Sequence, residues 1–288
     1  MTESVAGRLE LGVAGGGSLR WAAADVTPVV EEARRRLDLS PLAAAALGRS
    51  LTGAALLLNL ATKSVNRLTV EIRGDGPLRT ILAEADQEGN LRGMVGDRRV
   101  DLPAEASGKL PVGRAVGRGF LRVLREQESG HYSSQVRLVS GEVGQDLAHY
   151  LAQSEQTRSA VLLGVLAKPR GVAAAGGLIV EVLPDADSGM VELLERNVAR
   201  AGAVSRLLES SGMAGLVETL FAGLDVDSRG WLDLRYHCRC SRERLAQHLI
   251  VLSAEDRESL RLDDGRIEAE CAFCGNLYHF SRHELEPM

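Results

Sequence analysis

The alternation of hydrophobic and polar residues predicts strands at the start of the chain. Residues 5–14 and 18–26 alternate in the manner of half-buried strands, and the turn Gly15-Gly16-Gly17 lies between them. Two such strands joined by a short glycine-rich turn predict a β-hairpin.

Two capped helices are predicted directly after the hairpin. Thr27-Pro28 and Ser40-Pro41 each place a capping hydroxyl before a proline at the first helical position, which predicts helices near 28–37 and 41–60. The second helix is mostly alanine and leucine and is apolar on nearly every side, as is typical of a helix buried against a sheet. We therefore expect residues 41–60 to form a core element.

Short strand candidates separated by turn signals continue the pattern and predict an antiparallel meander. These candidates are 68–73, 80–85, 91–95, 120–125 and 135–139. A helix near 145–154 follows, and 160–167 and 178–183 supply further strands around the turn-rich 168–177. Runs of strands with segregated helices predict an α+β domain, a mainly antiparallel sheet packed with helices, over residues 1–184.

The pattern becomes helical and glycine-broken between residues 185 and 230. The breaks are Gly189, Gly202, Gly212, Gly215 and Gly223. A glycine inside a helix costs about 1 kcal/mol relative to alanine, so the segment depends on docking its apolar residues onto a partner surface. We interpret 185–230 as a helical, metastable linker, although periodicity alone also fits an ordinary small helical subdomain.

Composition narrows the class of protein. With 45% hydrophobic and 25% charged residues among 288, the chain is neither disordered nor collagenous, and its longest apolar runs fall short of the roughly 18 residues of a membrane span. The start Met1-Thr2-Glu3-Ser4 lacks the regions of a signal peptide, so we expect a cytoplasmic protein without membrane contact. The net charge of −5 argues against nucleic acid as a partner.

All four cysteines lie after residue 237, as Cys238-x-Cys240 and Cys271-x-x-Cys274. Two close pairs can fold back on each other and close a tetrahedral site of four thiolates, which Zn²⁺ prefers with sulfur ligands. Four unconnected buried thiols would leave the chelating spacing of both pairs unexplained. The spacing therefore predicts one zinc ion per chain, held by a small C-terminal domain over 231–288.

Folding of this domain is expected to depend on its thiols. Residues 231–288 are too few to fold by hydrophobic burial alone. Zinc binding of about 10–16 kcal/mol equals or exceeds the stability of a typical domain, about 5–15 kcal/mol, so zinc loss should unfold the region. Disulfides within such close pairs close only small rings and are reducible, so the spacing suits a reversible oxidant sensor.

Several motifs together resemble one known family. Cys238-Arg239-Cys240-Ser241-Arg242 and Cys271-Ala272-Phe273-Cys274-Gly275 look like the two halves of the zinc site of the bacterial 33-kilodalton heat-shock protein, a redox-regulated holdase chaperone. The similarity spans nearly the whole chain. It includes Ala46-Leu47-Gly48-Arg49, Gly74-Asp75-Gly76-Pro77-Leu78, Asp146-Leu147-Ala148-His149-Tyr150-Leu151, Ser154-Glu155-Gln156-Thr157 and Ala175-Gly176-Gly177. Met94, where many relatives are expected to carry an aromatic residue, departs from the pattern and concerns packing only.

The resemblance implies a mechanism and partners. Reduced, zinc-bound protein is expected to be inactive; oxidation is expected to form disulfides within each close pair, Cys238 with Cys240 and Cys271 with Cys274, with zinc release. The C-terminal region and linker then unfold, and the exposed apolar surface captures unfolded or partially folded client proteins without ATP. The activated form is expected to be a homodimer. The implied protein is a stress-response chaperone and not an enzyme.

Other interpretations of the same residues remain open. A zinc-ribbon nucleic-acid or translation-associated adaptor would need a basic surplus, and a thiol oxidoreductase would need Cys271-x-x-Cys274 to open a helix, whereas a strand-like 277–280 follows it. The arginines near Cys238 and Cys240 are expected either to form a solvated charged face or to favour the thiolate form of these two cysteines. The alternative metal ligands are His237, His248, His279 and His283, although four thiols already complete a tetrahedron.

Overall fold

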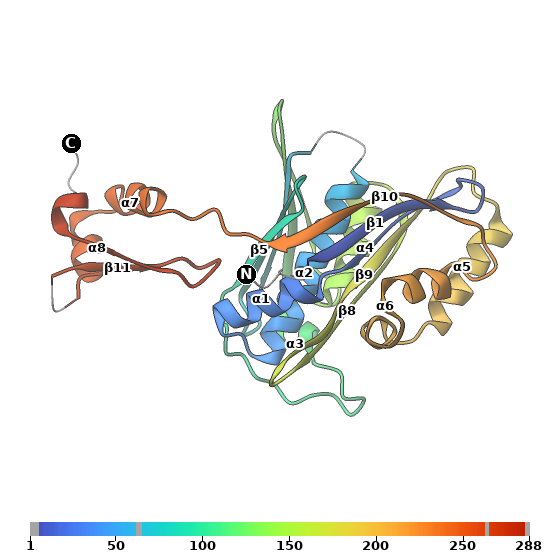
Figure 1. The fold of residues 1–288 in the computed structure, drawn as a ribbon, viewed down its shortest axis with the longest axis horizontal. Coiled ribbons are helices and arrows are strands. Elements are labelled where there is room, and N and C mark those ends of the chain that lie inside the picture. Colours follow the sequence, from blue (N-terminus) through green and yellow to red (C-terminus); the bar gives the residue numbers. More distant parts are fainter. Residues whose placement is uncertain (1–5, 62–64, 263–264, 286–288) are drawn as a thin grey trace. The chain divides into compact units, whose positions relative to one another are not determined.

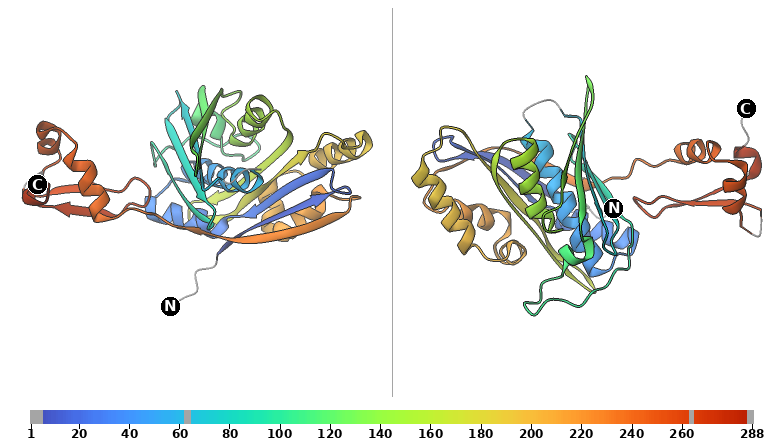
Figure 2. Two further views of the ribbon diagram at one scale, coloured as in Figure 1. Left: turned by 90° about the horizontal axis from the view of Figure 1, so that it is seen from above. Right: turned by 180° about the vertical axis from the view of Figure 1, so that it is seen from behind.

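The computed structural model describes residues 6–61, 65–262 and 265–285. Val5, the first residue of the predicted hairpin, and the start Met1-Thr2-Glu3-Ser4 lie outside the described residues. The chain divides into two compact units, Met1–Tyr236 and His237–Met288. The first unit is a curled sheet wrapped around a central helix, with two further helices on the outside of the sheet (Figures 1 and 2).

A ten-stranded sheet forms the first unit, in the order β7-β6-β3-β4-β5-β10-β1-β2-β9-β8. Its strands are β1 (Gly7–Ala14), β2 (Leu19–Asp25), β3 (Arg67–Gly74), β4 (Thr80–Asp86), β5 (Asn90–Val95), β6 (Gly119–Gln127), β7 (Gly130–Arg137), β8 (Arg158–Lys168), β9 (Gly171–Val182) and β10 (Val226–Tyr236). Every neighbouring pair is antiparallel except β10 and β5, which pair in parallel at Arg235 and Tyr236. The mixed, mainly antiparallel α+β architecture confirms the predicted fold class.

Helix α2 (Pro41–Leu60) is the central helix and has the predicted bounds. The hydroxyl of Ser40 accepts a hydrogen bond from the backbone N–H of Ala43 at 3.1 Å, so the predicted cap is present. The helix is long and apolar enough to cross a membrane, yet 94% of its most apolar window is buried inside this fold. Its apolar side chains therefore form the core that the sheet encloses.

Helix α1 (Thr27–Leu37) begins one residue earlier than predicted, because its cap is different. Val26 occupies the cap position and provides no side-chain hydrogen bond. The Thr27 hydroxyl instead donates to Asp25 at 2.6 Å, so the expected capping role of Thr27 is wrong.

Most of the segment 168–177, which is expected to be rich in turns, is strand, and only Pro169 and Arg170 form a turn. β9 already begins at Gly171 and runs against β2 and β8. A side-chain carbon at Gly176 would lie 2.1 Å from the carbonyl oxygen of Ala24, and one at Gly177 would lie 2.2 Å from that of Leu162. These glycines therefore permit close approach of neighbouring strands.

Among the described residues, four further helices pack against the sheet, two on its inner side and two on its outer side, where they form what we call the helical cover. α3 (Val112–Val116) is short, and α4 (Val143–Ser154) packs against β7 and β8. Helices α5 (Ser188–Arg200) and α6 (Val204–Leu220) lie on the outside of the sheet, and Gly212, with φ of 66°, kinks α6 as its glycine predicts. Together with Phe221 they cover an apolar face of β1, β2, β8 and β9, which we call the outer face.

The outer face and its helical cover form a second hydrophobic cluster, separate from the core around α2. Its buried members are Ala14, Leu19, Trp21, Ala23, Ala174, Leu178 and Val180 from the sheet, and Leu194, Ala201, Val204, Leu208, Leu216, Leu220 and Phe221 from the cover. After the helices α5 and α6, β10 spans the predicted boundary between the linker (185–230) and the zinc domain (231–288), and it returns the chain to the middle of the sheet.

The second unit is small and has little core of its own. It contains α7 (Arg242–Ile250), α8 (Ala254–Ser259), the antiparallel strands β11 (Ile267–Glu270) and β12 (Leu277–Phe280), and a 3₁₀ turn over Arg282–Leu285. Its fully buried apolar cluster consists of Leu249, Ile267, Phe280 and Leu285. So few buried side chains are insufficient to hold a unit of this size together.

Candidate metal centre

Two backbone segments of the second unit position the cysteines. Cys238 and Cys240 lie in the loop before α7, whose first turn is capped by the Ser241 hydroxyl. Cys271 and Cys274 lie in the tight turn between β11 and β12. In that turn the N–H of Cys271 donates to the Asn276 carbonyl at 2.9 Å, and Gly275 adopts φ of 72°, which glycine tolerates without strain.

The four sulfur atoms form one compact cluster of free thiols. The Sγ atoms of Cys238 and Cys271 are 3.7 Å apart, those of Cys240 and Cys274 are 3.4 Å apart, and all four lie within 4.8 Å of one another. A tetrahedral zinc site with bonds of about 2.3 Å has sulfur atoms about 3.8 Å apart. The donor set and its spacing therefore fit a four-coordinate Zn²⁺ ion.

The cluster is partly shielded from water. Cys271 and Cys274 are buried, and Cys238 and Cys240 are half-buried. Burial raises the pKa of the Cys238 and Cys274 thiols, because it disfavours the charged thiolate. A bound cation would reverse this preference, since coordination to a metal stabilises the thiolate form.

Cys240 differs from the other thiols because of Tyr278 on β12. The Tyr278 hydroxyl lies 3.2 Å from the Cys240 sulfur and donates to its thiolate form. Burial raises the pKa of Cys240, but hydrogen bonds from Tyr278 and from the neighbouring thiols outweigh it, so its pKa is lowered. The same bond raises the pKa of Tyr278 to about 12. The sequence analysis missed Tyr278, for which the only signal is its place in the predicted strand after the second cysteine pair.

The histidine and arginine alternatives receive no support. Among the residues that the structure describes, the four cysteines are the only group of His, Cys, Asp or Glu side chains arranged to hold a metal ion. Arg242 pairs with Glu284 at 2.7 Å and lies 4.7 Å from the centre of the Phe280 ring. Arg244 donates to the carbonyl of Arg239 at 2.9 Å. These arginines brace the unit, and none of the thiol pKa shifts has an arginine as a cause.

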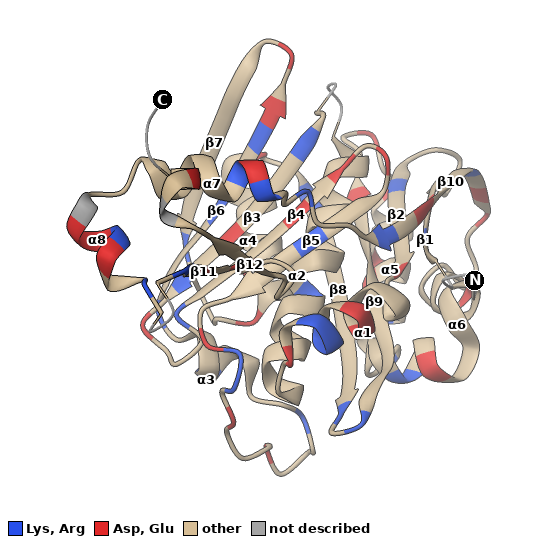
Figure 3. Ribbon diagram, turned by 60° about the vertical axis from the view of Figure 1, so that its left-hand side comes forward, with Lys and Arg blue, Asp and Glu red and all other residues tan. Residues whose placement is uncertain are grey.

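The charged residues of both units are mixed in sign. Figure 3 shows basic and acidic segments interspersed along the ribbon, and helices α7 and α8 each carry both kinds. A module that grips the phosphates of a nucleic acid gathers a surplus of basic side chains on one face. The distribution therefore agrees with the net charge of −5 in disfavouring the adaptor interpretation.

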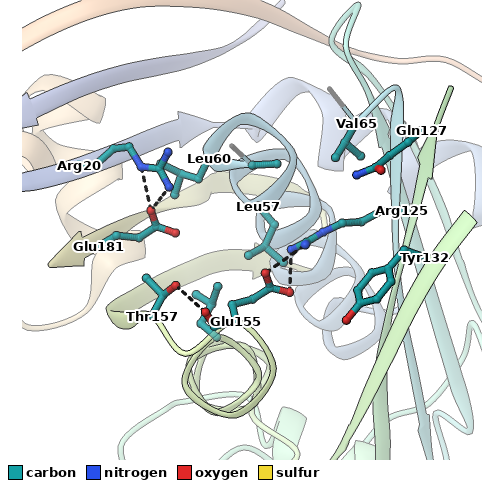
Figure 4. Close-up of a pocket in the computed structure, with 12 residues that line it drawn as sticks. Arg20, Leu57, Leu60, Val65, Arg125, Gln127, Tyr132, Glu155, Thr157 and Glu181 are labelled. Atoms are coloured by element: carbon teal, nitrogen blue, oxygen red, sulfur yellow. Dashed lines mark hydrogen bonds and ion pairs between the residues drawn. The ribbon is translucent and has the colours of Figure 1, made fainter. Parts of the chain in front are cut away.

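A polar pocket in the first unit is occupied by ion pairs between its own residues. Figure 4 shows Arg20 bonded to Glu181, and Arg125 paired with Glu155, in a cavity of about 480 Å³. Glu155 also accepts a hydrogen bond from Tyr150 at 2.7 Å. These side chains pair with one another in a packing network and do not form the arrangement of a nucleophile, base and orienting group.

A curled sheet with a helical cover, followed by a small four-thiol unit, defines an α+β protein with a candidate metal centre. Comparison with known proteins identifies the family. The "Hsp33 protein" family model matches residues 8–281, and the chain belongs to this Hsp33 family.

Curated relatives agree over nearly the full length. A "33 kDa chaperonin" of Thermus thermophilus is 45% identical over 294 residues, which cover 98% of this chain and 86% of the relative. A "33 kDa chaperonin" of Symbiobacterium thermophilum is 44% identical over 278 residues, covering 95% and 94% of the two chains. The crystal structure of a 33 kDa chaperonin from Thermotoga maritima has a TM-score of 0.86 at 35% identity and covers 96% of each chain.

Proposed function

We propose that this protein is a redox-regulated, ATP-independent holdase chaperone that protects unfolding proteins from aggregation during oxidative stress. The observation that carries the proposal is the apolar outer face of the sheet, which α5, α6 and the flanking residues Ala201, Phe221 and Leu224 bury. A surface of this kind, once uncovered, binds the apolar segments that unfolded proteins expose. The chaperone names of the relatives support the same function.

In the reduced protein we propose Cys238, Cys240, Cys271 and Cys274 as the ligands of one Zn²⁺ ion. When bound, the ion supplies four bonds that tie the loop before α7 to the turn between β11 and β12. The thiolates thereby replace the hydrophobic core that the unit lacks. Tyr278 keeps the Cys240 sulfur hydrogen-bonded within this arrangement.

Activation is the oxidation of these thiols. Each pair of thiolates loses two electrons as one S–S bond forms, and one hydrogen peroxide molecule accepts these electrons together with two protons from the solvent and leaves as two water molecules. Disulfides remove the ligands, so the unit unfolds. The resemblance predicts bonds between Cys238 and Cys240 and between Cys271 and Cys274. In the reduced cluster, short contacts join sulfur atoms of different pairs, at 3.7 Å for Cys238 and Cys271 and 3.4 Å for Cys240 and Cys274. The geometry of the reduced cluster therefore does not by itself select the disulfide pairing.

Chain connectivity couples the unit to the helical cover. Cys238 follows the last residue of β10 by two positions, and β10 pairs with β5 only at Arg235 and Tyr236. Unfolding of the second unit therefore loosens the end of β10, and β10 continues directly from the cover. We propose residues 1–184 as the client-binding domain, 185–230 as the metastable linker and 231–288 as the redox switch.

The remaining parts of the proposal follow from this switch. The partners are unfolded or partially folded clients, bound without turnover by a protein that acts in the reducing cytoplasm, where zinc-bound thiols persist. The active form is a homodimer, which sedimentation of the oxidised protein at several concentrations tests.

The proposal is tested with purified full-length protein and hydrogen peroxide at mild heat. We expect release of one zinc ion per chain, loss of four free thiols, and suppression of the aggregation of a thermally unfolding client. Protein kept in excess thiol reductant is the control and should do none of these. Client protection with zinc retained would contradict the switch, and salt-dependent RNA binding by the zinc-bound form would favour the adaptor function instead.

A further inference from the structure

The helical cover contains two of the three methionines that the structure describes. Met190 lies in the first turn of α5 and Met213 follows the kink of α6, and both pack, half-buried, against the outer face. The third, Met94 on β5, is also half-buried and belongs to neither of the two large hydrophobic clusters. The thioether sulfur of methionine is oxidised by the same reagents as thiols, so the cover carries oxidisable groups of its own.

Met190 lies on the turn that joins β1 and β2. A side-chain carbon at Gly15 would be only 2.1 Å from the Sδ of Met190 and 2.6 Å from its Cε, so the thioether occupies the space beside this glycine. The N–H of Met190 donates to the carboxylate of Asp187 at 3.1 Å, and this cap fixes the backbone at the start of α5. Figure 1 shows the turn beside α5. The start of the cover is therefore packed onto the glycine turn.

The same turn also holds the end of the cover. The backbone N–H of Gly15 donates to the carbonyl of Asp225 at 3.1 Å, and the N–H of Gly16 donates to its carboxylate at 3.0 Å. Asp225 directly precedes β10. A change at Met190 therefore acts on the cover at the opposite end of β10 from Tyr236, where thiol oxidation is proposed to act.

We propose that Met190 is a second oxidation site, whose sulfoxide weakens the docking of the cover by a route separate from the thiols. The sulfur of Met190 attacks one oxygen of hydrogen peroxide, the O–O bond breaks, and an S–O bond forms. The sulfur loses two electrons. The other peroxide oxygen leaves as hydroxide, which becomes water with the proton released from the transferred oxygen. The inference rests on the proposed function, since it adds a second input to that switch.

The surroundings of Met190 admit the oxidant but do not suit the product. Met190 is half-buried, and a side-chain carbon at Gly16 or Gly17 would meet no non-neighbouring atom within 4 Å, so the turn is open to a small molecule. The sulfoxide is polar, whereas the thioether packs with apolar side chains, and the N–H groups of Gly15 and Gly16 already donate to Asp225. The new oxygen therefore favours the undocked state, in which water solvates it.

We expect the docking equilibrium to weaken about tenfold, or by about 1.4 kcal/mol. One half-buried side chain makes only part of the apolar contacts of the cover, so reduced, zinc-bound protein should stay docked and inactive. The difference appears after the oxidant is gone. Thiol reductants restore the cysteines, whereas a methionine sulfoxide persists until a dedicated reductase removes it. Clients should therefore be released more slowly until Met190 is repaired.

The test uses full-length Trp231→Phe protein, in which Trp21, beneath the cover, is the only tryptophan. The protein is treated with hydrogen peroxide at a concentration that oxidises Met94, and then with dithiothreitol and zinc until four thiols are recovered. Mass spectrometry of peptides locates the sulfoxides. A urea titration followed by Trp21 emission measures docking, and the ratio of undocked to docked protein should rise about tenfold at each urea concentration.

Three variants make the test specific. Met190→Leu keeps an apolar side chain that peroxide does not oxidise, so its docking should not respond to the treatment. Met190→Gln places a polar side chain at the same position and should weaken docking about tenfold without peroxide. Met94→Gln changes a half-buried position outside the cover and is the matched control, which should leave the Trp21 titration unchanged. Methionine sulfoxide reductase should restore docking in the treated protein.

Three outcomes would overturn the inference. One is a sulfoxide at Met94 while Met190 stays unoxidised, and another is full oxidation of Met190 with unchanged docking. The third is an effect that survives Met190→Leu and disappears with Met213→Leu, which would assign it to α6. If peroxide never releases zinc, the proposed switch fails and these Trp21 results stand. If zinc release and client capture occur without the change in docking, only this inference fails.

Discussion

Replacing Phe221 by alanine should release the helical cover without any oxidant. Phe221 is 1% exposed, and its ring centre lies 5.8 Å from that of Trp21 on β2. It follows α6 directly and packs with the cover against the outer face of the sheet. The substitution therefore weakens the docking of the cover and leaves the core around α2 intact.

The size of the effect follows from burial. Truncating a fully buried phenylalanine to alanine costs about 3–5 kcal/mol, from lost apolar contacts and the remaining cavity. Because these contacts exist only when the cover is docked, the cost falls on the docking equilibrium. The equilibrium constant for docking of the cover should therefore shift by about two to four powers of ten towards the undocked state. We expect the variant to capture clients while still reduced and zinc-bound.

The two tryptophans provide the assay. Trp21 is 1% exposed beneath the cover, whereas Trp231 is 62% exposed on β10. In a Trp231→Phe background the fluorescence reports on Trp21 alone, and undocking should shift its emission to longer wavelength. Val226→Ala removes a 41% exposed side chain and is the matched control, with an expected effect within about 0.5 kcal/mol.

One result would refute the reasoning. If Phe221→Ala lowers the melting temperature while Trp21 emission stays unshifted and reduced protein captures no client, then the cover does not open as a unit. The outer face would then not be the surface that oxidation exposes.

Two further predictions concern the thiols and pH. Tyr278→Phe removes the hydrogen bond to Cys240 and makes its sulfur more nucleophilic, so peroxide should release zinc up to about fivefold faster, as followed with a chromogenic chelator. Glu31 accepts from the Val172 N–H at 2.9 Å, and its bond to Arg34 lowers its pKa below 4.5. Its stabilising effect is therefore complete above that pH and is lost as pH falls through the lowered pKa. Glu31→Gln should cost about 1 kcal/mol at pH 7, and thermal melts should show the difference shrinking on acidification.

Local chemistry made much of the fold predictable. Ser40 and Pro41 specify the start of α2, because a capping hydroxyl and a fixed φ act within one turn. The cysteine spacing likewise identified all four members of the thiol cluster, since chelating pairs have few other uses.

The missed features depend on contacts between distant residues. β10 has an exposed, polar sequence for much of its length, and only its pairing with β1 makes it a strand. Gly176 and Gly177 have the composition of a turn, yet they are glycines because neighbouring carbonyl oxygens leave no room for a side chain. Tyr278 acts on Cys240 through a bond between residues 38 positions apart. No local pattern reports such contacts.

The place of β10 in the sheet has a consequence for synthesis on the ribosome. β10 is the last strand of the first unit to be translated, yet it lies between β5 and β1. Until Tyr236 leaves the exit tunnel, the nascent chain contains two half-sheets with unpaired inner edges at β5 and β1. Premature termination before Val226 would leave both edges permanently open, and such fragments should aggregate or require other chaperones.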